Sequence, residues 1–170
     1  MARRQHNARG RTLARLAHFQ ACRIWGFGLI ELPVEQPDDW DPERTAELLA
    51  GLGLAASVCA VMPPDRDLLV DDAEVVAVTQ EYIRYCIEAA ATVGSRVVAG
   101  PIYAAVERFW QLEDRGGDTA IETLVARLRP LADYAGERGV RLALEPLNRF
   151  ETSFLNTAEL GVVARLGSPA

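Results

Sequence analysis

The stretch Leu142-Ala-Leu-Glu145-Pro146-Leu-Asn-Arg-Phe-Glu151-Thr-Ser-Phe-Leu-Asn-Thr-Ala-Glu159 places two carboxylates, Glu145 and Glu151, where a short apolar run gives way to a polar loop. Pro146 disfavours the helical conformation for the residue before it, so Glu145 is predicted to end a β-strand. A carboxylate at the carboxyl end of a buried strand is costly to place unless it binds a metal, a cation or a substrate. In a βα-barrel, catalytic residues gather at that end of the strands.

A unit of helix, glycine and short apolar strand recurs along the rest of the chain. Helices are predicted over residues 12–25, from Asp41 to about Gly51, from Asp71 or Asp72 to about Val93, and from the capping box Thr119–Glu122 to just before Gly139. The strands that follow glycines are expected at Leu29–Leu32, within Leu54–Met62, at Arg96–Gly100 and at Val140–Glu145. Each strand leads into a polar or proline-marked loop, and the first of these loops is read as Pro33–Pro37.

Short apolar strands that alternate with amphipathic helices predict a parallel sheet wrapped by helices. Long loops after the strands and short glycine turns before them are typical of a (β/α) barrel. A doubly wound open sheet shares part of this pattern, but the first strand–helix turn has no G-x-G-x-x-G fingerprint. The predicted fold class is therefore α/β, a partial (β/α)8 TIM barrel that comprises roughly its first half to two thirds, with parallel strands and outer helices.

The number of strands is lower than a closed barrel requires, since such a barrel has eight strands in roughly 250 residues. Because a glycine precedes each predicted strand, Gly167 is expected to precede a further strand. The barrel is therefore expected to be incomplete at its C-terminal end, and it is expected to lack its first strand as well. Residues 1–11 carry several arginines and no acidic residue, and they are expected to form a basic N-terminal arm. Residues 12–170 are expected to form the incomplete barrel domain.

Composition excludes several classes of protein. The 170 residues are 49% hydrophobic and 25% charged, with a mean hydropathy of +0.01, which is typical of a soluble protein with one core. A net charge of −6 argues against nucleic acid or an anionic membrane surface as a partner. The three cysteines, Cys22, Cys59 and Cys86, are widely spaced, so they predict reduced thiols in a cytoplasmic protein and neither a disulfide framework nor a zinc knuckle.

All 18 basic residues are arginine. The absence of lysine excludes a Walker-type phosphate loop and Schiff-base chemistry, because both need an amine. The only histidines, His6 and His18, lie near the N-terminus, far in sequence from Glu145 and Glu151. A Ser-His-Asp arrangement therefore has almost no residues from which it could be built.

The motif Glu145-Pro-Leu-Asn-Arg-Phe-Glu151, followed by Leu155-Asn-Thr-Ala-Glu159, resembles the D-tagatose/D-psicose 3-epimerase family, which belongs to the sugar phosphate isomerase/epimerase group of xylose isomerase-like TIM barrels. Weaker matches are Gly26–Leu32 and Val98–Tyr103. The resemblance extends over about residues 12–168, which would correspond to about the first two thirds of the family's barrel.

The resemblance implies roles for particular residues. Glu145 would ligate a divalent cation, Mn²⁺ or alternatively Co²⁺ or Mg²⁺, and would also move the proton at sugar C3. Glu151 would bind substrate hydroxyls, and the backbone near Pro101 would line the sugar pocket with the aromatic loop Tyr103–Trp110. The family's other ligands, an Asp, a His and a second catalytic Glu on later strands, have no counterpart in this sequence. A hard cation needs several such ligands.

The resemblance implies a metal-dependent ketose 3-epimerase that acts through an enediolate on a small-molecule sugar. It leaves open whether the protein forms a homo-oligomer. Another sugar (phosphate) isomerase or epimerase, or a hydroxypyruvate isomerase, remains an alternative within the fold. The DNA-repair endonuclease branch is disfavoured by the net charge of −6. A hypothesis of another class is that the polypeptide is a non-catalytic fragment, so the sequence leaves open whether this chain is an enzyme.

Overall fold

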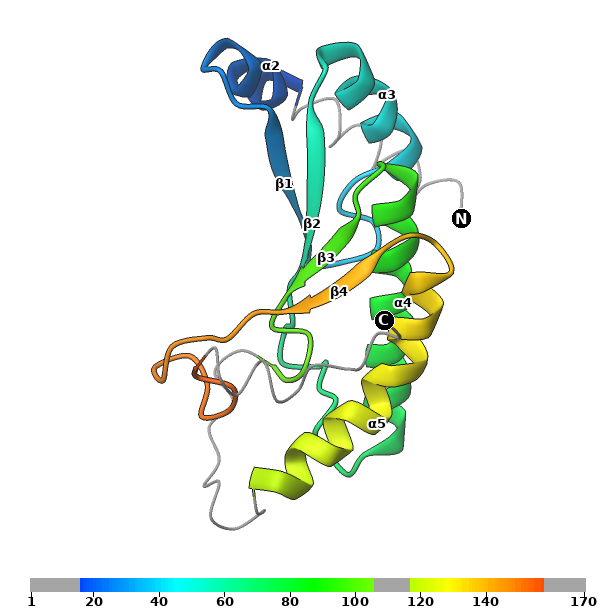
Figure 1. Cartoon of the computed structure of the whole chain (residues 1–170), viewed down its shortest axis with the longest axis vertical. Helices are drawn as coiled ribbons and strands as arrows, with labels where there is room; N and C mark the ends of the chain where they lie inside the picture. The colour runs from blue at the N-terminus through cyan, green and yellow to red at the C-terminus, as the bar shows by residue number, and fades with distance from the viewer. Residues whose placement is uncertain (1–15, 106–116, 158–170) are drawn as a thin grey trace.

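The structure is a computed structural model that describes residues 16–105 and 117–157. Its helices and strands alternate along the chain (Figure 1). In order they are α2 (Leu16–Ile24), β1 (Leu29–Val34), α3 (Pro42–Leu52), β2 (Ala55–Ala60), α4 (Ala73–Thr92), β3 (Val97–Gly100), α5 (Gly117–Gly136) and β4 (Arg141–Leu144). The expected N-terminal arm, most of the loop Tyr103–Trp110 and the further strand expected after Gly167 lie outside the described residues.

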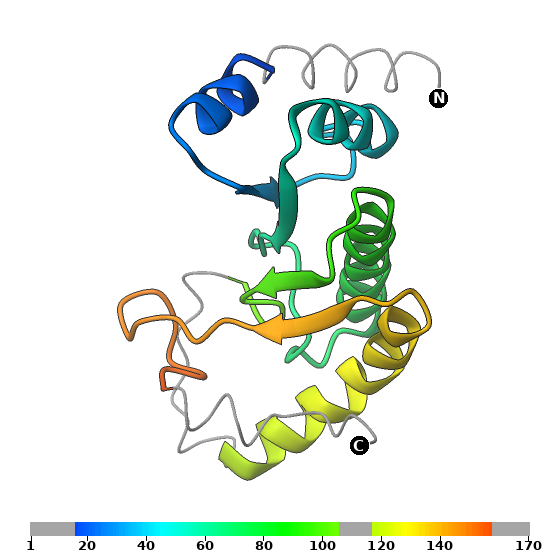
Figure 2. The same cartoon turned by 45° about the horizontal axis from the view of Figure 1, so that its top comes forward.

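The four strands form one parallel sheet in the order β1-β2-β3-β4. Helices α3, α4 and α5 lie together against one face of it, and α2 lies beside the edge strand β1 (Figures 1 and 2). The predicted parallel sheet with outer helices is thus confirmed. Each connection from strand to helix to strand returns the chain to the neighbouring strand, which is the repeating unit of a βα-barrel.

The hydrophobic core lies between the sheet and these helices. Val58 and Val98 are fully buried on the sheet, Ile83 and Ile87 on α4, and Leu124 on α5. In β1 and β2 buried residues alternate with more exposed ones, because successive side chains of a strand point to opposite faces. The helix-covered face therefore holds the core, and the opposite face is free to build a site.

Two helix starts follow the sequence signals. Asp41 caps α3, with its side chain accepting a hydrogen bond from the Arg44 N–H and Pro42 in the first turn. Asp72 caps α4 in the same way. The predicted capping box at Thr119 is wrong, because α5 begins at Gly117 and Thr119 lies inside the helix. The loop expected from Pro33 is also wrong in its first residues, since β1 continues through Pro33 to Val34.

The position of β1 at the sheet edge explains how it accommodates a proline. Ala55 donates a backbone hydrogen bond to Gly28 and Val61 donates one to Val34. The backbone groups of the even-numbered residues of β1 therefore form hydrogen bonds with β2. The backbone groups of the odd-numbered residues, which include Pro33, point to the open edge of the sheet. Proline lacks an N–H, so it is tolerated where no neighbouring strand needs that donor.

Candidate functional site

The carboxyl ends of the four parallel strands lie at one edge of the sheet (Figure 1). Glu145 directly follows β4, which ends at Leu144. Its backbone is fixed from two sides: the N–H donates to the Gly100 carbonyl (3.0 Å), and the carbonyl accepts from the Tyr103 hydroxyl (3.1 Å). The Glu145 residue is exposed. A rigid backbone that presents an exposed carboxylate at this edge is the geometry required for binding or proton transfer.

Glu151 lies in the loop that follows Glu145, and two asparagines shape this loop. Asn148 accepts a hydrogen bond from the Phe150 N–H (2.8 Å) and donates from its side chain to the Glu151 carboxylate. Asn156 donates to the backbone carbonyls of Leu147 (3.0 Å) and Thr152 (2.8 Å). The asparagines of the sequence motif are therefore structural, because they hold the loop in the conformation that carries Glu151.

Leu155 in the same loop has a φ of 52° and is the non-glycine residue with positive φ among those described. Its side chain is buried. A branched residue in this conformation costs of the order of 1–3 kcal/mol and persists only where the surroundings impose it. The loop after β4 is thus held in place against a local preference, as is common at functional sites.

Pro101 follows β3 and is buried, with its carbonyl accepting the Tyr103 N–H (2.7 Å). Tyr103 joins this loop to the one after β4, since its ring packs edge-on against Phe154 with centroids 5.8 Å apart. Burial raises the pKa of Tyr103 to about 12, and the negative charges of Glu145 and Glu151 contribute to the rise. The structure thus brings the three predicted site residues around one tyrosine.

A second carboxylate, Glu31, faces the same side of the sheet as Glu145. Both raise the pKa of the Cys59 thiol, although burial is the larger cause. Glu31 is exposed and lies beside Ser57 in the register of β1 and β2. The face away from the helices therefore carries carboxylates from both edges of the sheet, with Cys59 between them.

Arg66, for which the sequence indicates only a place in a loop, is buried at this end of the sheet. Its guanidinium donates to the Glu35 carbonyl (2.5 Å) and the Gln36 side chain (2.8 Å), and it lies 3.8 Å from the centre of the Tyr82 ring. The Tyr82 hydroxyl in turn donates to the Val34 and Val61 carbonyls. Arg66 and Tyr82 thus tie together the loops after β1 and β2. An arginine after a Pro-Pro pair gives no sequence signal for such a role.

The buried Tyr82 and Tyr103 and the half-buried Tyr85 predict a steep loss of stability at alkaline pH. Burial raises the pKa of Tyr103 and of Tyr85 to about 12, and raises that of Tyr82 further. Below pH 10 both the folded and the unfolded chain keep these protons, so stability is unaffected. Between about pH 10 and 12 the unfolded chain releases them first, and each such tyrosine lowers the unfolding free energy by up to about 1.4 kcal/mol per pH unit.

The measurement is a pH titration that follows tyrosinate absorbance and circular dichroism together. Tyrosinate from these residues should appear only as the secondary structure is lost, whereas the chain in denaturant should titrate near the ordinary tyrosine pKa. Full ionisation near pH 10 with an intact circular dichroism spectrum would contradict the burial of Tyr82 and Tyr103 and the partial burial of Tyr85.

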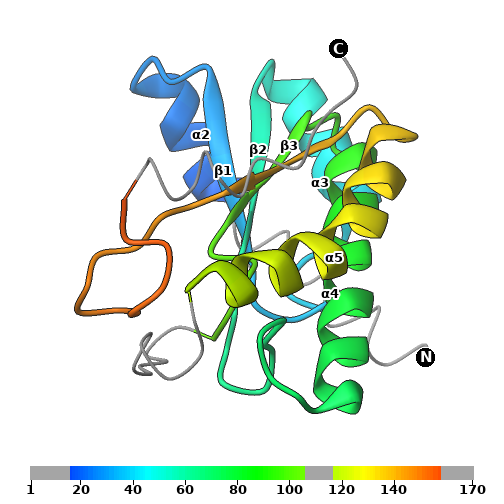
Figure 3. The same cartoon turned by 60° about the horizontal axis from the view of Figure 1, so that its bottom comes forward.

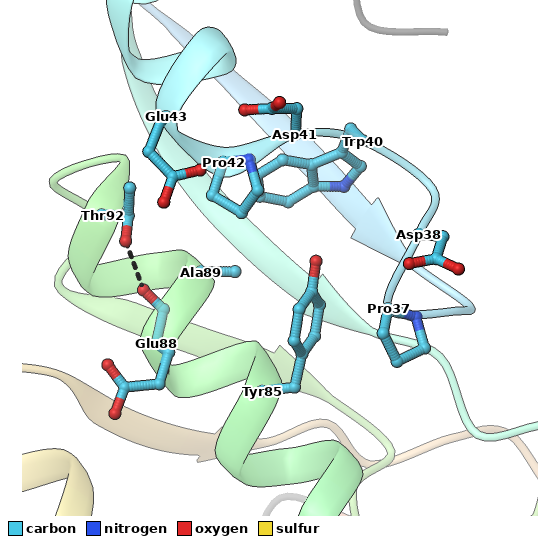
Figure 4. Close-up of a pocket in the computed structure, with 10 residues that line it drawn as sticks. All are labelled: Pro37, Asp38, Trp40, Asp41, Pro42, Glu43, Tyr85, Glu88, Ala89 and Thr92. Carbon is cyan, nitrogen blue, oxygen red and sulfur yellow. Dashed lines mark hydrogen bonds between the residues drawn. The ribbon is translucent and has the colours of Figure 1, made fainter. Parts of the chain in front are cut away.

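A separate cavity of about 470 Å³ lies on the helix side of the sheet, between the loop after β1, the start of α3 and the end of α4 (Figure 4). Tyr85 and Pro42 contribute to its walls, and the carboxylates of Asp38, Glu43 and Glu88 border it. None of the predicted site residues lines this cavity. It is therefore distinct from the site at the carboxyl ends of the strands.

The donor groups of the described residues do not suffice for a divalent cation. Across residues 16–105 and 117–157, no three His, Cys, Asp or Glu side chains come close enough together to hold a metal ion. Glu145 offers one carboxylate, and a hard cation needs several oxygen or nitrogen ligands. The described residues thus do not by themselves fit the metal site that the sequence motif implies.

The sheet of parallel strands with outer helices and a carboxylate at the end of β4 defines half of a βα-barrel. Residues 19–167 match the family model described as xylose isomerase-like TIM barrel, and the chain belongs to this family. In the described part of the chain, no helix has the length and apolar character needed to cross a membrane.

The chain is 31% identical over 138 residues to a ketose 3-epimerase of Arthrobacter globiformis, a match that covers 81% of this chain and 47% of the relative. It is 35% identical over 137 residues to an L-ribulose 3-epimerase of Mesorhizobium japonicum, with 81% and 45% covered. The chain thus spans about half the length of these relatives, within the half to two thirds of a barrel expected from the sequence.

The solved structure of a D-allulose 3-epimerase from Methylomonas sp. in complex with D-allulose superposes with a TM-score of 0.81 and 25% identity, over 90% of this chain and 52% of that chain. A structure of L-ribulose 3-epimerase gives a TM-score of 0.79 and 31% identity, with 92% and 52% covered. Both similarities confirm the partial barrel.

Proposed function

We propose that this chain carries part of the active site of a sugar isomerase or epimerase of the ketose 3-epimerase type. The observation that supports the proposal is the position of Glu145, an exposed carboxylate held by two backbone hydrogen bonds at the carboxyl end of β4. The similarity to a ketose 3-epimerase and an L-ribulose 3-epimerase supports a small ketose sugar as the proposed class of substrate. The cytoplasm is the proposed compartment, as for other proteins with free thiols.

The chemistry assigns a role to each carboxylate. A proton next to a ketose carbonyl is weakly acidic, and a positioned carboxylate can remove it to give an enediolate. Glu145 is the proposed proton carrier at C3, and Glu151, held by Asn148, is the proposed acceptor of substrate hydroxyls. The buried Pro101 and Tyr103 would form the wall behind the sugar. Inversion at C3 requires a second proton carrier on the opposite face of the sugar.

A second candidate is that the chain is a non-catalytic fragment. The specific observation in its favour is that the chain covers only 45–47% of its epimerase relatives, while the described residues hold no metal-binding cluster. The Mn²⁺, Co²⁺ or Mg²⁺ of a complete site would need ligands from the remaining half of a barrel. On this hypothesis the chain retains the fold of that half and lacks its activity.

Two assays separate these possibilities. The purified 170-residue chain is expected to show neither saturable Mn²⁺ binding by calorimetry nor C3 epimerisation of fructose or tagatose. A chimera in which residues 16–157 replace the matched half of the Arthrobacter globiformis enzyme is expected to epimerise one of these ketoses. A folded but inactive chimera would refute the proposed function, and activity of the isolated chain would refute the fragment hypothesis.

A further inference from the structure

The peptide unit that follows Glu145 depends on one side chain for its orientation. Strand β4 ends at Leu144, and the loop that follows, orange in Figures 1 and 3, projects away from α3 and α4. The next residue is Pro146, which has no N–H. The peptide unit between Glu145 and Pro146 can therefore form a backbone hydrogen bond only through the Glu145 carbonyl, and that carbonyl accepts from the Tyr103 hydroxyl (3.1 Å).

Tyr103 is itself held by contacts within three loops. It is only 1% exposed. Its N–H donates to the Pro101 carbonyl (2.7 Å), and its own carbonyl accepts from the Leu68 N–H in the loop after β2 (3.0 Å). Its ring packs edge-on against Phe154 in the loop after β4. A side chain locked by packing and hydrogen bonds on all sides can position a functional group closely.

The loop after β2 is anchored in turn by helix α5. The Arg127 guanidinium donates to the carbonyls of Leu68 (2.6 Å) and Val70 (2.9 Å). Hydrogen bonds thus connect α5 to the loop after β2, that loop to Tyr103 in the loop after β3, and Tyr103 to Glu145. The last of these bonds is the one that reaches a residue proposed to take part in the chemistry.

The state of the Tyr103 hydroxyl suits this role. Burial raises the pKa of Tyr103 to about 12, and the charges of Glu145 and Glu151 add to the rise. The hydroxyl is therefore protonated at neutral pH and can donate to the Glu145 carbonyl. Correct placement of a reacting group matters, because a misplacement of about 1 Å can lower a rate about 10²-fold.

We propose that Tyr103 is a positioning residue for proton transfer by Glu145. Its hydroxyl fixes the peptide unit between Glu145 and Pro146, and thereby the direction in which the Glu145 carboxylate is presented. The inference rests on the proposed function, in which Glu145 carries the C3 proton. The Tyr103 hydroxyl acts through the Glu145 backbone and needs no contact with the sugar.

The first test uses the 170-residue chain and requires no activity. Tyr103→Phe keeps the ring that packs against Phe154 and removes the hydroxyl. Amide hydrogen exchange followed by NMR should show the Glu145 N–H, which donates to Gly100, exchanging at least roughly tenfold faster. The Val61 N–H, which donates to Val34, serves as the internal reference, so that a general loss of stability is divided out.

Tyr134→Phe is the matched control for this measurement. It also removes a hydroxyl that forms a hydrogen bond, in this case between Tyr134 on α5 and Glu88 on α4. The exchange of the Glu145 N–H relative to that of Val61 should be the same as in the parent chain. A Tyr103→Phe chain with equally unchanged relative exchange at Glu145 would overturn the proposal.

The second test uses the chimera with the Arthrobacter globiformis enzyme and separates positioning from a role in folding alone. Tyr103→Phe should lower kcat at least roughly tenfold, with KM changed by less than about twofold. In a chimera that already carries Glu145→Gln, the same substitution should not lower the residual rate further, because Tyr103 acts through Glu145. Tyr134→Phe should leave kcat unchanged.

The outcomes distinguish this inference from the function on which it rests. A chimera that is inactive without any substitution would refute the proposed function, and with it the role of Tyr103. An active chimera whose kcat does not respond to Tyr103→Phe would overturn the role of Tyr103 alone. An equal loss of rate with and without Glu145→Gln would do the same, because it would show that Tyr103 does not act through Glu145.

Discussion

Gly100→Ala is expected to destabilise the fold severely. Gly100 ends β3 with a φ of 132°, and a Cβ at this position would lie 2.3 Å from the carbonyl oxygen of Ala60 in β2. The clash is with backbone, so no side-chain rotation can relieve it. Either β2 and β3 separate or Gly100 changes its conformation, and each alternative disturbs the Gly100 carbonyl that accepts the Glu145 N–H.

The expected loss is at least about 4 kcal/mol, at the upper end of single substitutions, against about 5–15 kcal/mol for a whole domain. Thermal and urea unfolding followed by circular dichroism measure it. Gly51→Ala is the control, because Gly51 lies in α3 with open space where a Cβ would stand, and the substitution should stabilise the fold by about 0.5–1 kcal/mol. A Gly100→Ala protein that unfolds within about 1 kcal/mol of the parent would contradict the close approach of β2 and β3.

Much of the fold follows from local sequence signals. The caps at Asp41 and Asp72 were predictable because a short polar side chain before an acidic first turn satisfies the free N–H groups of a helix. The parallel sheet was predictable from the apolar strands between the helices. The extension of β1 through Pro33 was not, because it depends on which strand lies at the sheet edge. Which strand lies at the edge is a property of the assembled sheet, and a short segment of sequence does not indicate it.

In the candidate site, too, some positions follow from the local sequence and others depend on long-range packing. Pro146 places Glu145 at the end of a strand, so its position was predictable from the chain alone. The hydrogen bond from Tyr103 to the Glu145 carbonyl joins residues 42 positions apart, and the burial of Arg66 depends on the loop after β1. Such long-range contacts follow from packing, and the sequence indicates them only through resemblance to a family.

Glu145→Gln is expected to reduce kcat/KM of the active chimera by at least about 10³-fold, within the range for loss of a general acid or base. Glutamine preserves the shape of the side chain and can still form hydrogen bonds, but it cannot take up a proton at neutral pH. The fold should be unaffected, because Glu145 contributes its backbone groups to the neighbouring loops while the residue itself is exposed. The measurements are steady-state epimerisation kinetics and the exchange of the C3 proton with deuterated water.

Two further variants identify what Glu145 does. Glu122→Gln removes an exposed carboxylate from α5 and should leave both the kinetics and the melting temperature unchanged. Glu151→Gln should mainly raise KM, because Glu151 is proposed to hold substrate hydroxyls and takes no part in proton transfer. A Glu145→Gln chimera that retains epimerisation would refute the assignment, and one that loses turnover but keeps C3 proton exchange would move the proton transfer to another residue. Loss of both, at an unchanged melting temperature, is the result that a proton carrier fixed at the end of β4 requires.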